Sequence, residues 1–195
     1  VSAETAFVFN TFLFVFSGVL VMFMALGFSM LEAGFVRKKN TSAILLKNIA
    51  LYSIAGIMFY LIGYSLMYVD VSGYIGSLGG AFYDTADDLT AAAEEGGYSL
   101  ASDWFFQMVF CATAISIVSG ACAERIKVWP FMIFAAFMTG IIYPIYGAWT
   151  WGGGWLTEMG FSDFAGSTIV HSVGGWAALT GCLILGPRAG KYGSD

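Results

Sequence analysis

The residues best suited to chemistry are the single histidine of the chain and an aspartate that precedes it. The stretch DFAGSTIVHSVGG at 163–175 contains both, Asp163 and His171, and is otherwise mostly apolar. An ionisable side chain inside an apolar, membrane-crossing segment is costly to bury and commonly marks a functional site. A neutral imidazole there could hydrogen-bond a small polar solute, or it could simply link two helices. The sequence leaves both interpretations open.

Asp163 directly precedes a helix-length apolar run, and two roles fit this place. Its carboxylate could accept hydrogen bonds from the first backbone N–H groups of the helix, acting as a cap. A negative charge at the mouth of a membrane path would also lower the energy of an approaching cation. The two roles are compatible.

Aromatic residues gather in two further stretches. WTWGGGW at 149–155 contains three tryptophans, which could anchor the chain at a membrane interface or bind a cation on their ring faces. In DWFFQMVF at 103–110, Phe106 and Phe110 are spaced to share one side of a helix. Ordinary packing explains these phenylalanines, and a role in closing a path is the alternative.

Several classes of function are not expected. The three cysteines lie in apolar runs without metal-ligand spacing, so we expect no metal site and no cofactor. No basic patch interleaved with aromatic residues is present, which argues against a nucleic-acid partner. Asp163 and His171 have no accompanying nucleophile or metal cluster, so we do not expect an enzyme.

The elements that must position these residues are membrane-spanning helices. The chain is 58% hydrophobic and only 11% charged, whereas soluble domains average about a quarter charged residues. A bilayer core needs about 20 apolar residues of helix. Five stretches qualify, at about 6–34, 43–69, 104–123, 129–151 and 167–186. We therefore predict an all-α polytopic membrane protein with one membrane domain over residues 1–195.

The charged residues predict an orientation. All eight basic residues are expected at one face of the membrane: Arg37, Lys38, Lys39, Lys47, Arg125, Lys127, Arg188 and Lys191. The segments 70–103 and 152–166 are expected to be acidic loops at the other face, with Asp70, Asp84, Asp87, Asp88, Glu94, Glu95, Asp103, Glu158 and Asp163. By the positive-inside rule, the N-terminus is outside and the C-terminus cytoplasmic. Near the inner end of the first stretch, Glu32 is expected to pack or to pair with Arg37 and Lys38.

Four segments together resemble the ammonium transporter family, in its Amt branch. They are GFSMLEAGFVRKKN at 27–40, SGACAERIKVWPF at 119–131, WGGGWL at 151–156 and DFAGSTIVHSVGGWAAL at 163–179. The resemblance covers nearly the whole chain. It implies an eleven-helix fold built from two inverted five-helix repeats plus a final helix, with this chain as the first repeat. It also implies a homotrimer with a pore through each subunit.

The resemblance assigns roles to individual residues. Trp151 is similar to a tryptophan that attracts ammonium by cation–π contact in an outer vestibule. Phe110 resembles one of two stacked phenylalanines that close the vestibule, and Phe106 its neighbour near the entrance.

Deeper in the implied path, Asp163 matches an aspartate that supports recruitment and the local fold. Ala165 contributes a backbone carbonyl to the site, and His171 is similar to the first of two pore-lining histidines. The second histidine, the second phenylalanine and a vestibule serine are expected in the second repeat, beyond these 195 residues, so the chain is expected to be a truncated sequence.

The implied function is recruitment of NH₄⁺ outside and passage of NH₃ through a hydrophobic, histidine-lined pore of the cell membrane. An ammonium sensor linked to signalling and a non-conducting fragment are the alternatives. A regulatory protein of the PII type is an expected cytoplasmic partner.

Overall fold

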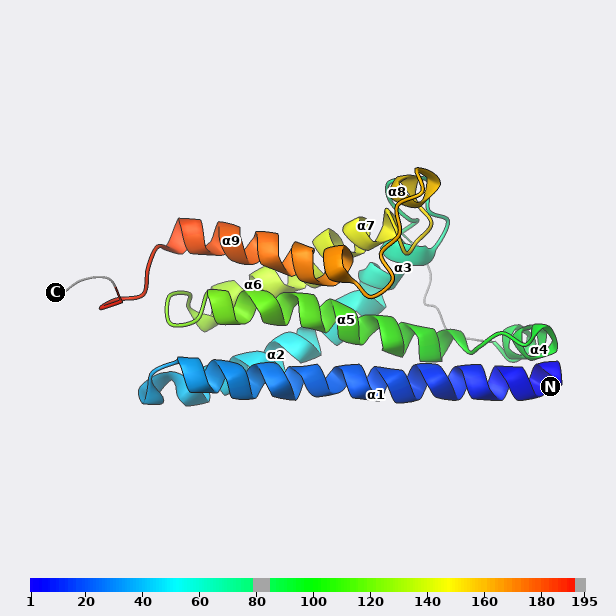
Figure 1. Cartoon of the computed structure of the whole chain (residues 1–195), viewed down its shortest axis with the longest axis horizontal. Helices are drawn as coiled ribbons and strands as arrows, with labels where there is room; N and C mark the ends of the chain where they lie inside the picture. The colour runs from blue at the N-terminus through cyan, green and yellow to red at the C-terminus, as the bar shows by residue number, and fades with distance from the viewer. Residues whose placement is uncertain (79–84, 192–195) are drawn as a thin grey trace.

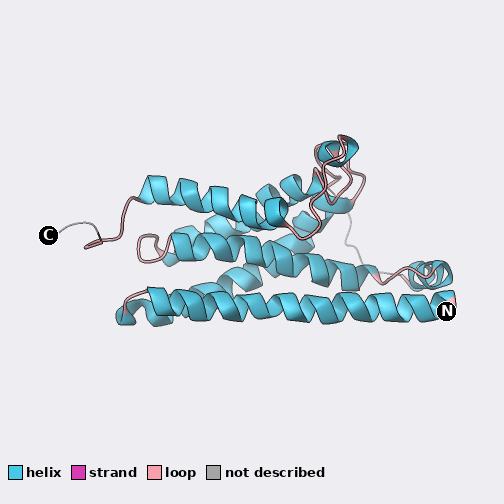
Figure 2. Cartoon of the chain, in the orientation of Figure 1, coloured by secondary structure: helices cyan, strands magenta, loops and turns pink. Residues whose placement is uncertain are grey.

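In the computed structural model, which describes residues 1–78 and 85–191, every regular element is helical (Figure 2). The longer helices are α1 (Ala3–Phe35), α2 (Thr41–Met58), α5 (Leu100–Ala121), α6 (Val128–Phe137) and α9 (Val173–Leu185). The shorter helices are α3 (Tyr64–Tyr68), α4 (Ala86–Glu95), α7 (Tyr143–Ala148) and α8 (Trp155–Glu158).

The described helices form five segments long and apolar enough to cross a membrane. They are Ala3–Phe35, Lys38–Tyr68, Leu100–Ala121, Val128–Ala148 and Ser167–Leu185. The predicted all-helical fold with five spans is therefore confirmed. The second span begins at Lys38 instead of residue 43, because a 3₁₀ turn at Lys38–Asn40 leads directly into α2.

Two of the spans are interrupted by a π-helical turn, at Phe59–Gly63 and Met138–Ile142, and the fifth span begins with one, at Ser167–Ser172. Such turns are rare and often occur at functional sites, because they re-aim side chains within an otherwise regular helix. The third of them contains His171, so the predicted pore residue lies on irregular helix.

Helix α5 is central to the bundle and packs against α1, α2 and α9 (Figure 1). Small residues permit the closest of these approaches. A Cβ atom added to Gly174 of α9 would lie 2.8 Å from the carbonyl oxygen of Ala114 in α5. Without a hydrophobic effect between helices in lipid, such close backbone packing is a main source of stability.

The two ends of the bundle differ in charge. The N-terminus, α4 and α8 lie at one end, whereas the turns after α1 and α5 and the segment after α9 lie at the other (Figure 1). Basic residues concentrate in the latter turns, as the sequence predicted, with one exception. Lys47 is buried inside the bundle and donates a hydrogen bond to the Ser119 carbonyl oxygen at 2.9 Å.

At the basic end, Glu124 in the turn after α5 is hydrogen-bonded to the turn after α1. Its carboxylate accepts hydrogen bonds from the backbone N–H of Arg37 at 2.8 Å, from the Arg37 Nε at 3.1 Å and from the Asn40 side chain at 2.6 Å. These contacts, led by the backbone N–H of Arg37, lower the pKa of Glu124 to about 2.

Of the two roles expected for Glu32, packing inside the bundle is found, and pairing with Arg37 or Lys38 is not. Glu32 is buried and accepts hydrogen bonds from the Asn48 side chain at 2.9 Å and from the Ser119 hydroxyl at 2.8 Å. Its place on α1 turns it toward α2 and α5 rather than toward the basic turn.

The acidic segment expected as a loop at 70–103 is also more ordered than predicted. Helix α4 lies within it, and Thr85 and Asp88 form a reciprocal capping box at its start. Helix α5 begins at Leu100, so Asp103 lies in its first turn and is 7% exposed. Asp84 lies outside the described residues.

Candidate functional site

A cavity of about 540 Å³ opens at the acidic end of the bundle, between α1, α3, α5 and the segments around residues 151 and 165. Its lining consists of Phe14, Tyr64, Tyr68, Tyr98, Asp103, Phe106, Gln107, Phe110, Trp151, Phe164 and Ala165. Four of the residues singled out in the sequence, from three separate segments, therefore meet at one site: Phe106, Phe110, Trp151 and Ala165. We refer to it as the outer cavity.

Aromatic rings form a continuous wall of the outer cavity. The Phe106 and Phe110 ring centroids are 5.0 Å apart with planes at 84°. Phe110 and Trp151 are 5.9 Å apart at 73°, and Phe14 and Phe106 are 5.2 Å apart at 70°. Edge-to-face pairs of this kind are favourable and hold each ring in one orientation. The helical spacing of Phe106 and Phe110 thus brings both rings to this one wall.

Of the three tryptophans at 149–155, Trp151 is the one that lines the outer cavity. Trp149 and Trp155 pack against each other with centroids 5.6 Å apart. The Trp149 indole N–H donates to the Tyr74 carbonyl oxygen at 2.9 Å, which fixes this ring on the loop after α3. The sequence could not separate these three roles, because all three residues suit a membrane interface.

Asp163 organises the turn beside Trp151 and does not line the cavity. Its Oδ1 atom accepts hydrogen bonds from the backbone N–H groups of Gly166 and Ser167 at 2.9 and 3.0 Å. Its Oδ2 atom accepts from the N–H groups of Thr168 and Ile169 at 2.8 and 2.9 Å, and from the Thr168 hydroxyl at 2.6 Å. The carboxylate therefore caps the fifth span, although the formal first residue of the helix is several positions later.

This arrangement determines the charge of Asp163. Burial raises the pKa of its carboxyl, but the hydrogen bonds from the Thr168 hydroxyl and from backbone N–H groups outweigh burial and lower the pKa to about 2. The Asp163 backbone carbonyl in turn accepts a hydrogen bond from the Trp151 indole N–H at 2.6 Å. One residue thus holds both the start of the span and the orientation of Trp151.

Gly166 is required in the same turn. Its φ of 85° lies in the left-handed region, and an added Cβ would lie 2.7 Å from the Val170 side chain and 3.2 Å from the Trp151 ring. The glycine therefore lets the turn and Trp151 approach each other.

His171 is not brought to the outer cavity. It lies in the π-helical turn at Ser167–Ser172, its side chain is exposed, and its backbone N–H donates to the Gly166 carbonyl oxygen at 3.0 Å. Within the described part of the chain, no hydrogen bond is made by its imidazole. Among the described residues, no contact therefore supports the interpretation of His171 as a link between helices.

Sequence reasoning missed the polar part of the outer cavity. Asp103 accepts a hydrogen bond from the Tyr64 hydroxyl at 2.7 Å and from the Gln107 side-chain amide at 3.4 Å. In DWFFQMVF, Asp103 and Gln107 are four positions apart, as are Phe106 and Phe110. Helical spacing therefore predicts that the two polar residues lie on the same side of the helix as the two phenylalanines. Tyr64 could not have been found, since its partner is 39 positions away.

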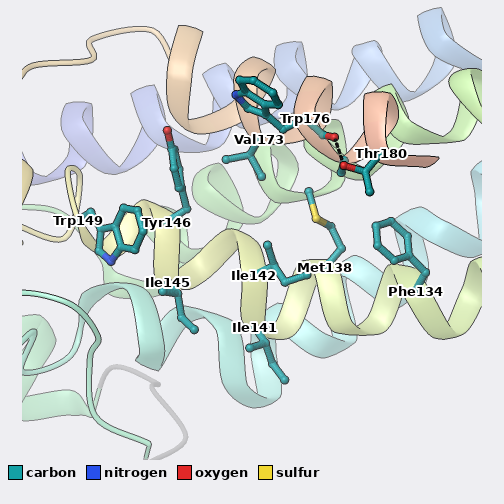
Figure 3. A pocket seen from close by; sticks show the side chains of 11 residues that line it. Phe134, Met138, Ile141, Ile142, Ile145, Tyr146, Trp149, Val173, Trp176 and Thr180 are labelled. Carbon is teal, nitrogen blue, oxygen red and sulfur yellow. Dashed lines mark hydrogen bonds between the residues drawn. The ribbon is translucent and has the colours of Figure 1, made fainter. Parts of the chain in front are cut away.

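A second cavity, of about 640 Å³, has a different character. Figure 3 shows it between the span that contains α6 and α7 and the helix α9, with Met138, Ile142 and Tyr146 facing Val173 and Trp176. Its lining is almost entirely apolar, and the hydroxyl of Thr180 is used internally in a hydrogen bond to the Trp176 carbonyl oxygen at 2.9 Å. This second cavity has few polar groups that could replace the water molecules around an ion, so the outer cavity is the better candidate site.

Comparison with known proteins identifies the family. Residues 12–195 match the model of the Ammonium Transporter Family. Ammonium transporter Amt2 of Archaeoglobus fulgidus is 43% identical over 189 residues, which cover 91% of this chain and 38% of that protein. Ammonium transporter Amt2 of Haloferax mediterranei is 41% identical over 179 residues, 90% of this chain and 38% of that protein.

A solved structure described as a Sensor Amt Protein superposes with a TM-score of 0.82 at 38% identity, over 95% of this chain and 46% of that one. The chain thus spans less than half the length of these relatives, and it aligns with their N-terminal part. The chain belongs to the ammonium transporter family, a family of membrane transporters and not of enzymes.

Proposed function

We propose that residues 1–195 supply the ammonium-recruiting entrance and the first half of the pore in an ammonium transporter. The observation that carries the proposal is the convergence of Phe106, Phe110, Trp151 and Ala165 on one outer cavity. The indole of Trp151 is the strongest cation–π partner among side chains, worth about 0.5–2 kcal/mol depending on desolvation. An aromatic wall of this kind attracts NH₄⁺, but it does not replace the full hydration shell of a more strongly hydrated cation. The wall therefore favours NH₄⁺ over such cations.

The next step is transfer of a proton from NH₄⁺ to water at the outer mouth, which leaves neutral NH₃ and H₃O⁺. Moving an ammonium ion as such through an apolar path would cost far more than the aromatic contacts return. Neutral ammonia passes more cheaply, and the imidazole of His171 can exchange hydrogen bonds with it. Asp163 contributes by holding the turn that orients Trp151 and begins the fifth span.

The proposal extends to the whole protein. We propose that residues 1–195 form one membrane domain, the first of two inverted repeats, in a protein of the cell membrane with its N-terminus outside. The turns after α1 and α5, which hold most of the basic residues, lie at the opposite end of the bundle from the acidic helix α4 (Figure 1), and this supports the orientation. Assembly as a homotrimer and regulation by a PII-type protein at the basic end complete the proposal.

A sensor of ammonium is the second candidate. The superposition on a solved Sensor Amt Protein favours it, because a receptor needs the outer cavity but not a high flux. A sensor would bind ammonium at the outer cavity and transport it slowly or not at all.

Uptake of radiolabelled methylammonium tests the proposal in cells that lack ammonium uptake of their own. The full-length reading frame that contains residues 1–195 should restore uptake. Trp151→Leu should raise the KM roughly three- to tenfold through the lost cation–π contact, and His171→Ala should change the maximal rate or the selectivity against K⁺.

Trp129→Leu is the matched control, because Trp129 is 79% exposed at the start of α6 and far from the outer cavity in sequence and in the fold. Uptake that is unchanged in both Trp151→Leu and His171→Ala would refute the transport role of these residues. Specific ammonium binding without uptake would favour the sensor.

A further inference from the structure

Among the described residues that line the outer cavity, Asp103 is the one that carries a charge. The other described lining residues are aromatic, small or neutral, and neither lysine nor arginine is present among them. The Asp103 side chain is 7% exposed, on the first turn of α5 and one helical turn from Phe106. A carboxylate is therefore enclosed by the same aromatic wall that suits a cation.

The protein satisfies this carboxylate only in part. A carboxylate offers about four acceptor positions, and the described contacts of Asp103 are one short hydrogen bond from Tyr64 and one long one from Gln107. Both donors are neutral. Asp163, by contrast, receives four backbone N–H groups and a hydroxyl. Buried charges are normally paired, so Asp103 has the environment of a group that awaits a cation.

Two neighbouring polar atoms in the same wall also have unused hydrogen-bonding capacity. The side-chain oxygen of Gln107 and the hydroxyl oxygen of Tyr68 are buried and have no hydrogen-bond partner among the described residues. Both residues line the outer cavity. Leaving such groups unpaired is unfavourable, and an ammonium ion, which donates up to four hydrogen bonds and accepts none, matches acceptors of this kind.

We infer that Asp103 is a specificity-determining residue of the outer cavity, where its carboxylate, together with the Gln107 amide oxygen, accepts hydrogen bonds from NH₄⁺ held against Phe106, Phe110 and Trp151. The inference rests on the proposed function and assigns the negative charge that the aromatic wall lacks. In a site of low dielectric constant, a nearby carboxylate stabilises a cation and has little effect on a neutral solute. Asp103 thus makes the cavity select ammonium ion over ammonia.

The test compares charge with shape at position 103 in the full-length reading frame. Asp103→Asn removes the charge and keeps the size of the side chain. It should raise the KM for methylammonium about tenfold or more, with the maximal rate within about twofold of the unmodified protein. Tyr64→Phe removes the hydrogen bond from the Tyr64 hydroxyl to Asp103 but leaves the charge, so its KM should rise far less. Asp87→Asn, which removes an exposed charge on α4, should leave the KM unchanged.

The pair Asp103→Glu and Asp103→Gln repeats the comparison with a longer side chain, should Asp103→Asn fail to accumulate in the membrane. The charged variant should keep a KM several-fold below that of the neutral one. Equal KM values within this pair, or equal effects of Asp103→Asn and Tyr64→Phe, would overturn the inference and show a structural role. Uptake by the unmodified protein would at the same time leave the proposed function intact.

A binding measurement keeps the inference testable in a protein that transports nothing. Ammonium chloride should raise the Tm of the purified, detergent-solubilised protein relative to sodium chloride, because a ligand of the folded state stabilises it. The rise should be lost in Asp103→Asn and kept in Asp87→Asn. An equal rise in Asp103→Asn and the unmodified protein would refute the inference, whether or not uptake is seen.

Discussion

Replacement of Asp163 by asparagine should destabilise the fifth span strongly, although the two side chains have nearly the same shape. In the unmodified protein, the Thr168 and Ile169 N–H groups donate to the second carboxylate oxygen of Asp163. Asparagine keeps one acceptor oxygen but places an NH₂ group, which cannot accept, opposite these donors. The pKa of about 2, compared with the ordinary 3.8, corresponds to roughly 2 kcal/mol in favour of the folded state. Counted instead as backbone donors left without a partner, the same hydrogen bonds are worth about 1–3 kcal/mol. We therefore expect a loss of roughly 2–3 kcal/mol.

The measurement is the free energy of unfolding of the purified protein in detergent, from denaturant titration followed by circular dichroism. Asp87→Asn is the matched control, because Asp87 lies on the exposed helix α4, and its replacement should change stability by no more than about 0.5 kcal/mol. Near-ultraviolet spectra should also change in Asp163→Asn, since the Trp151 indole is hydrogen-bonded to the same turn.

The pH dependence gives an independent check with a defined sign. Because the folded-state pKa of Asp163 is lowered, its contribution is fully present above about pH 4 and is lost as the pH falls toward 2. The unmodified protein should therefore lose more stability over this interval than Asp163→Asn does. A stability loss below about 0.5 kcal/mol in Asp163→Asn, or identical pH profiles of the two proteins, would refute the role of the carboxylate as a cap.

Two further predictions concern the packing of the bundle. Glu124→Gln should cost about 1–3 kcal/mol of stability, because it weakens the charged hydrogen bonds to the turn at Arg37. The unmodified protein should lose this contribution as the pH falls from about 4.5 to 2, because the pKa of Glu124 is lowered in the folded state. A stability that does not change over that pH interval would contradict the prediction. Gly174→Ala should cost roughly 2 kcal/mol or more, because its Cβ would meet the backbone of Ala114, whereas no atom of the described residues lies within 4 Å of a Cβ at Gly175. Denaturant titration of Gly174→Ala and Gly175→Ala compares the two directly, and equal stabilities would show that α5 and α9 are not closely packed.

The sequence was sufficient for the spans because hydrophobic segments of helical length have few alternatives in a bilayer. Asp163 was also recognisable as a cap, since a carboxylate before an apolar helix has a local partner in the first N–H groups. Phe106 and Phe110 could be placed on one face from helical periodicity alone. Each of these inferences depends on neighbours within a few positions.

The expectations that were not met concern partners distant in sequence. Glu32 lies near Arg37 along the chain, yet it is hydrogen-bonded to Asn48 and Ser119 across the bundle. The direction of a side chain around a helix is decided by which faces the other helices cover, and hydropathy alone does not give those faces in a segment that is apolar all round.

What the sequence by itself determined is the helical, five-span architecture, the separation of charges between its two ends and the list of residues suited to cation recruitment. The tertiary structure decided which of them meet: it brings Phe106, Phe110, Trp151 and Ala165 to one cavity, leaves His171 exposed, and adds Asp103 from a segment that the sequence predicts as a loop. The physical reason is that helix propensity and hydrophobicity act locally, whereas a binding cavity is formed by the packing of segments that are far apart in the chain.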